Sequence, residues 1–104
     1  MKNNNLPTIS NYGYYSSGNY GAHTIKVDIP PTRKNKHGIT IYYSYDTCIA
    51  FRGYVNSEKQ GLFICKNEWG TTTGKHLNFI NSNKDIRLDY PTFEKLFKKA
   101  LANA

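Results

Sequence analysis

The sequence predicts an α+β fold in which an antiparallel sheet of four to five strands packs with a short helix and a C-terminal amphipathic helix on one face. Two observations carry this prediction. The middle of the chain alternates apolar and polar residues, as strands do, and its last segment repeats apolar residues with the period of a helix. The length of 104 residues fits one domain with a small core.

The strand prediction begins at residue 23, where Ile25, Val27 and Ile29 alternate with polar residues until Pro30-Pro31 stops the run. Residues 39–45 alternate again, and a tight turn is expected at Asp46-Thr47. Two further strands are expected at residues 48–54 and 62–66, joined by a polar loop. The segment from Asn11 can add a strand or an extended loop, because its glycines and serines disfavour a long helix.

The prediction of a C-terminal helix rests on an N-capping residue and on a stripe of apolar residues along one side of the helix. Asp89 can cap a C-terminal helix and Pro91 fits its first turn, where no backbone donor is needed. The apolar stripe follows the i, i+3, i+4 spacing: Phe93, Leu96, Phe97, Ala100 and Leu101. A shorter helix of about two turns is expected after Gly70, with a threonine available as its cap. We assign residues 1–10 to a flexible or edge-pairing N-terminal arm and residues 11–104 to a single domain.

The charge favours an anionic partner. Fourteen Lys or Arg residues face seven Asp or Glu residues, which gives a formal net charge of +7. A basic surface attracts nucleic acid or nucleotides, and also acidic proteins. No apolar run is long enough for a membrane span and no signal-peptide core follows Met1, so we expect a cytoplasmic protein without a membrane partner.

The segment 71–76, Thr-Thr-Thr-Gly-Lys-His, has the residue types of a phosphate cradle. Gly74 permits close backbone approach, the helix start offers unpaired N–H groups, and Lys75 supplies charge. The segment is not a P-loop. A P-loop has four residues between its two glycines and a serine or threonine after the lysine, whereas three residues separate Gly70 from Gly74 and His76 follows Lys75. The alternative is an ordinary threonine-capped helix with an exposed lysine.

Aromatic residues add a second indication. Two tyrosine clusters are interleaved with basic residues, an arrangement that can stack bases while cations hold the backbone. They are Tyr12, Tyr14, Tyr15 and Tyr20, and Tyr42, Tyr43, Tyr45 and Tyr54. Tyr42 lies opposite the apolar face of its strand and is the better candidate for an exposed ring, whereas Tyr43 and Tyr45 are expected to fill the core. The expected anion-binding or nucleic-acid-binding residues are therefore Tyr20, His23, Tyr42, Arg52, Thr73, Gly74, Lys75 and His76.

A catalytic alternative uses two of these residues. If His23 and His76 meet, one imidazole as base and the other as acid could cleave a phosphodiester without a metal. Structural hydrogen bonding by both histidines is the competing interpretation. We expect a binding protein rather than an enzyme, with no catalytic residue, no metal and no cofactor, since the spacing of Cys and His fits no zinc site.

Three sequence blocks together resemble a group of short uncharacterised proteins of bacteriophages, plasmids and other mobile elements, grouped as a domain of unknown function. They are YSSGNYGAH at 15–23, YxTxIAFR at 45–52 and WGTTTGKHLN at 69–78. The resemblance runs from about Asn11 to Leu101 and departs in the basic insert 30–37. It implies an accessory protein that binds nucleic acid or a host protein, for example as an inhibitor of a CRISPR nuclease or another host defence nucleoprotein. Such a protein acts in the host cytoplasm. Separately from the resemblance, a domain of this size with open sheet edges is expected to be a monomer or a homodimer paired at those edges.

Overall fold

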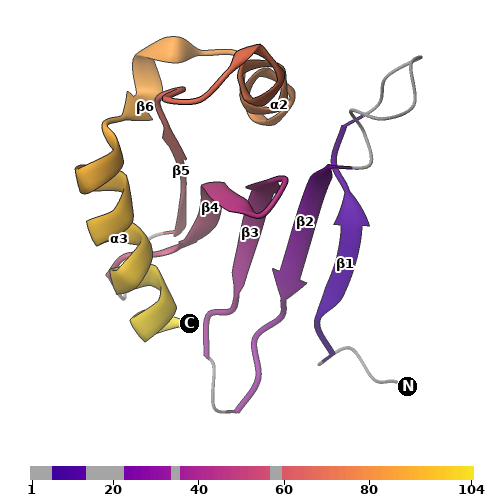
Figure 1. The fold of residues 1–104 in the computed structure, drawn as a ribbon. Helices are drawn as coiled ribbons and strands as arrows, with labels where there is room; N and C mark the ends of the chain where they lie inside the picture. The colour runs from indigo at the N-terminus through magenta and orange to yellow at the C-terminus, as the bar shows by residue number, and fades with distance from the viewer. Residues whose placement is uncertain (1–5, 14–22, 34–35, 57–59) are drawn as a thin grey trace.

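The computed structural model describes residues 6–13, 23–33, 36–56 and 60–104 of the chain. Within these ranges the chain forms one six-stranded sheet and two α-helices (Figure 1), so the α+β prediction is confirmed. The elements run β1 (Thr8–Asn11), β2 (Thr24–Ile29), β3 (Ile39–Ser44), β4 (Thr47–Tyr54), β5 (Gln60–Cys65), α2 (Thr71–Ile80), a 3₁₀ turn η1 (Lys84–Ile86), β6 (Arg87–Leu88) and α3 (Tyr90–Asn103).

The strands lie side by side in their order along the chain. All neighbouring pairs are antiparallel except β5 and β6, which are parallel. The sheet is therefore mixed and has six strands in the described ranges, where the sequence predicted an antiparallel sheet of four to five. The difference lies in the two short edge strands, β1 and β6, which are too short to show an alternating pattern. Strand β1 begins at Thr8, within the segment assigned to the N-terminal arm.

The hairpin between β3 and β4 turns one residue earlier than the sequence predicted. Ser44 pairs with Thr47, so the two turn residues are Tyr45 and Asp46. Tyr45 has a φ of 58°, a left-handed conformation that is uncommon for a bulky residue. Its backbone N–H donates to the carbonyl of His23 at 3.0 Å, which extends the pairing of β2 with β3.

The two helices lie on opposite faces of the sheet, and the expectation of one shared face is wrong. Thr24 pairs with Ser44, and the Ser44 hydroxyl contacts His76 of α2. We call the sheet face that α2 covers the α2 face, and the opposite one the α3 face. Residues Asp28, Thr40 and Arg52 share this α2 face, because they pair with one another and lie an even number of residues from Thr24 or Ser44.

Side chains of β4 that point the other way form the α3 face. The Phe51 ring lies 5.5 Å from that of Phe93 and 5.3 Å from that of Phe97, ring centroid to ring centroid. In Figure 1, β5 stands between the two helices. The sheet can bury both faces of β4 because Ile49, Ala50 and Phe51 are apolar in succession.

Helix α3 starts as the sequence predicted. The Asp89 carboxylate accepts a hydrogen bond from the backbone N–H of Thr92 at 2.9 Å, and Phe93 and Ala100 of the stripe are buried. Helix α2 begins differently, since its N-cap is Gly70 and no side chain caps it. Its first turn also has no acidic residue, so the positive end of this helix dipole is not offset locally.

Candidate anion-binding site

Helix α2 has an inner and an outer side with different environments. Thr73, His76 and Leu77 face the sheet and are buried. Thr71, Gly74, Lys75 and Asn78 follow the i, i+3, i+4, i+7 spacing of one helix side and line an open hollow. The predicted residues at 73–76 are thus divided between the packing of α2 and its solvent side.

The inner side is held by hydroxyl and imidazole contacts. Ser44 Oγ lies 2.7 Å from His76 Nδ1 and 3.0 Å from Thr73 Oγ1. His76 is 0% exposed, so this imidazole cannot touch a ligand on the surface. Thr73 and His76 fix α2 on the sheet through hydrogen bonds. For His76, this is the structural role that the sequence left open.

The outer side of α2 forms one wall of a hollow of about 430 Å³, which we call the basic hollow. The opposite wall comes from η1 and β6, so segments on both sides of the loop 81–83 meet here. Its lining residues are Asn67, Thr71, Gly74, Lys75, Asn78, Lys84 and Arg87. Three of these residues are cationic and none is acidic.

Arg87 joins the two walls of the basic hollow. Its Nη2 donates to Asn78 Oδ1 at 2.9 Å and to the carbonyl of Asn81 at 3.2 Å. Parallel pairing of β6 with β5 sets Arg87 opposite Ile64. The Nε of Arg87 is buried and makes no hydrogen bond within the described part of the chain, and a buried donor of this kind favours a nearby acceptor.

Gly74 shapes the floor of the hollow. A Cβ on Gly74 would lie 3.0 Å from Asn67 Nδ2, closer than such contacts normally come. The Asn67 amide is itself fixed, since Nδ2 donates to the carbonyl of Gly70 and Oδ1 accepts from the N–H of Trp69. Glycine therefore lets the loop 66–70 approach α2 closely.

The other predicted residues that the structure describes do not line the basic hollow. His23 is exposed and stacks on Tyr45 with 4.2 Å between ring centroids. The Tyr45 ring is in turn 5.9 Å from the His76 ring. The half-buried Tyr42 meets Tyr12 edge to face. Tyr20 lies outside the described residues.

Arg52 is exposed on the α2 face of the sheet, in the row formed by Thr40, Arg52 and Leu62. Neither Arg52 nor His23 lines the basic hollow. Of the predicted residues, the structure brings Gly74 and Lys75 together, and it adds Lys84 and Arg87, which sequence reasoning missed. The signal that could have found them is the positive charge just after the Asn-rich end of α2.

The two cysteines are not poised as nucleophiles. Both are free, and burial raises the pKa of the Cys48 thiol and of the Cys65 thiol to about 12. Both side chains are therefore protonated at neutral pH, and the reactive form is the thiolate. Across the described ranges, no three His, Cys, Asp or Glu side chains gather in a way that could hold a metal ion.

No helix in the described part of the chain is long and apolar enough to cross a membrane. Comparison with curated proteins and with solved structures finds no significant match. A model of a protein family of unknown function, DUF8033, matches residues 13–95. The match spans both walls of the basic hollow, and the chain belongs to this family of unknown function.

Proposed function

We propose that this protein is a non-catalytic binding protein that holds phosphates of single-stranded nucleic acid in the basic hollow. The observation that carries the proposal is the meeting of Lys75, Lys84 and Arg87 around one concavity, where no residue of the described ranges that lines it is acidic. Phosphate oxygens are acceptors that such a cluster binds well, since Arg and Lys supply charged donors and amide side chains supply neutral ones.

The surroundings of the hollow support a nucleic acid over a small inorganic anion. The acidic residue of the loop 66–70, Glu68, accepts a hydrogen bond from the N–H of Tyr90 at the start of α3. The Trp69 side chain on the same loop is 42% exposed. An exposed indole can stack on an unpaired base. The faces of the bases are accessible in a single strand and are covered by neighbouring base pairs in a duplex.

The geometry favours binding over catalysis. A metal-free nuclease that uses His23 and His76 needs both imidazoles at the substrate, and His76 is enclosed behind Ser44. The likeness of the three sequence blocks to proteins of phages and plasmids supports an accessory role of this kind in the host cytoplasm.

The test is fluorescence anisotropy with a labelled oligonucleotide at increasing salt. If three phosphates are neutralised, the log of the binding constant falls with log salt with a slope of about −2. The Lys75→Ala/Lys84→Ala double variant should bind more weakly and reduce that slope to about −0.7.

The matched control is the Lys98→Ala/Lys99→Ala double variant, which removes the same charge from exposed positions of α3. Equal losses in both double variants would show that only net charge matters and would reject the basic hollow. No binding by the wild-type protein, together with capture of an acidic host nucleoprotein that oligonucleotides do not displace, would favour the alternative of an inhibitor of host defence.

A further inference from the structure

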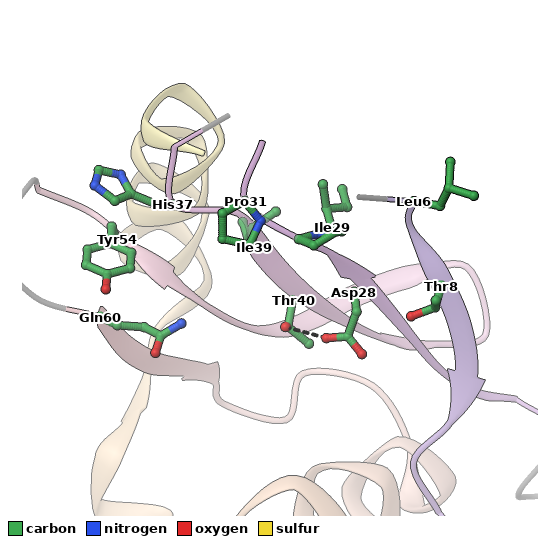
Figure 2. Close-up of a pocket in the computed structure, with 11 residues that line it drawn as sticks. Leu6, Thr8, Asp28, Ile29, Pro31, His37, Ile39, Thr40, Tyr54 and Gln60 are labelled. Carbon is green, nitrogen blue, oxygen red and sulfur yellow. Dashed lines mark hydrogen bonds between the residues drawn. The ribbon is translucent and has the colours of Figure 1, made fainter. Parts of the chain in front are cut away.

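A second hollow lies on the α2 face of the sheet, beyond the end that α2 covers (Figure 2). Its volume is about 480 Å³, and we call it the sheet hollow. Strands β1 to β5 all contribute to it or border it, and Ile39 and Pro31 form apolar parts of its wall. It shares no lining residue with the basic hollow.

The polar groups of the sheet hollow come from one face because of the strand register. Asp28 pairs with Thr40, and Tyr54 pairs with Gln60. Thr40 pairs with Arg52, two residues from Tyr54, so all of these side chains point to the same side. In Figure 2, Tyr54 and Gln60 lie on one side of Thr40, and Asp28 lies on the other side and bonds to Thr40.

The carboxylate of Asp28 is suited to a neutral donor rather than a cation. Its Oδ1 accepts from the Thr40 hydroxyl at 2.6 Å, and its Oδ2 lies 3.6 Å from Lys26 Nζ. Lys26 therefore already balances the charge. Each carboxylate oxygen retains a second lone pair, so two neighbouring N–H groups of a ligand can still be accepted.

Two aromatic side chains line another part of the sheet hollow. The Tyr54 ring stacks on the His37 ring with centroids 4.3 Å apart. His37 Nδ1 lies 2.8 Å from the carbonyl oxygen of Asn103 at the end of α3, which fixes the imidazole and with it the stack. A rigid aromatic surface with a single oriented carboxylate is the combination that binds a planar heterocycle.

We propose that the sheet hollow binds a guanine base of the same strand whose phosphates occupy the basic hollow, an inference that rests on the proposed function. Guanine is the base whose Watson–Crick edge presents two adjacent donors, N1–H and N2–H, and these match the two oxygens of the Asp28 carboxylate. Gln60 offers an amide donor for the guanine O6.

One continuous nucleic-acid strand can reach both hollows, because residues of β5 line the first and pair with a residue of the second. Gln60 lines the sheet hollow, and Ile64, four residues further along β5, pairs with Arg87 of the basic hollow. Four residues of a strand span about 13 Å, a distance of a few nucleotides. The exposed Arg52 lies on the intervening part of this face and can hold a phosphate between the two hollows.

The test compares oligothymidine with the same oligonucleotide carrying a single guanosine, or a single inosine, which lacks the N2 amino group. Wild-type protein should bind the guanosine oligonucleotide about tenfold more tightly than oligothymidine, and the inosine oligonucleotide should lose most of this gain. Asp28→Asn should abolish the difference between guanosine and inosine while it still binds oligothymidine.

Asp46→Asn is the matched control, since it makes the same charge change on the exposed hairpin turn. It should retain the guanosine preference, and circular dichroism should show that both variants fold. DNA and RNA versions of each oligonucleotide separate the two possible sources of the base. Binding of all oligonucleotides with equal affinity would overturn this inference alone, whereas binding of none would overturn the proposed function.

Discussion

The two sides of α2 have opposite environments although their residues alternate along the same ten-residue helix. On the inner side, His76 is 0% exposed and bonded to Ser44. On the outer side, its neighbour Lys75 is exposed and lines the basic hollow. Two consecutive residues, Lys75 and His76, thus supply a cation for an anionic partner and the attachment of the helix to the sheet.

This division has a consequence that can be measured. Truncation of buried side chains on the inner side should lower the free energy of unfolding, and removal of the Lys75 charge on the outer side should lower affinity with little change in stability.

Leu77→Ala should lower the free energy of unfolding by about 2–5 kcal/mol, because it leaves a cavity where a fully buried side chain packed. Urea denaturation followed by circular dichroism measures this loss. Lys75→Ala on the outer side should change the same quantity by less than about 0.5 kcal/mol. Similar losses in the two variants would contradict the separation.

Ser44→Ala should cost about 1–3 kcal/mol, since it removes a hydroxyl that contacts both His76 and Thr73 in a buried place. Ser10→Ala is the matched control, because Ser10 is exposed on β1. If the Ser44 variant is as stable as the Ser10 variant, the buried hydroxyl does not anchor α2.

Arg87→Lys keeps the charge of the basic hollow but loses the guanidinium that joins Asn78 to the carbonyl of Asn81. We expect a loss of about fivefold in affinity for a single strand, corresponding to about one hydrogen bond. The salt slope should not change, because the number of cations is the same. Anisotropy titrations at several salt concentrations measure both quantities.

The starts of the two helices should respond differently to acid. Hydrogen bonds from Thr92 lower the pKa of Asp89 at the start of α3. Because the folded pKa lies below the unfolded value of about 4, this stabilisation is complete above that value and disappears as the pH falls through the folded pKa.

Asp89→Asn should remove this part of the acid dependence and retain a capping side chain. Thermal unfolding between about pH 2 and pH 6 compares the variant with the wild type. An unchanged pH profile in the variant would show that Asp89 contributes nothing to the acid response.

The sequence was most informative where local rules decide the structure. The cap at Asp89, Pro91 and the stripe through Phe93 predict α3, because each acts within a few residues. The alternation of residues 24–29 and 39–44 likewise predicts β2 and β3. The helix–sheet arrangement was less predictable, because α2 and α3 both have an apolar side and nothing local determines which sheet face each one covers.

The residues of the basic hollow were also difficult to predict, because contacts between distant parts of the chain bring them together. Gly74 and Lys75 stand out in the sequence, but Lys84 and Arg87 reach them only through the parallel pairing of the two-residue strand β6 with β5. A two-residue strand has no recognisable period. The burial of His76 was equally hidden, because its partner Ser44 lies 32 residues away.

The most direct test is an NMR titration of ¹⁵N-labelled protein with unlabelled oligothymidine, which maps the bound surface by backbone amide shifts. Binding in the basic hollow predicts shifts concentrated at residues 71–78 and 84–87, with residues 98–103 of α3 unchanged. Shifts centred on α3, or spread evenly over the basic surface, would contradict it.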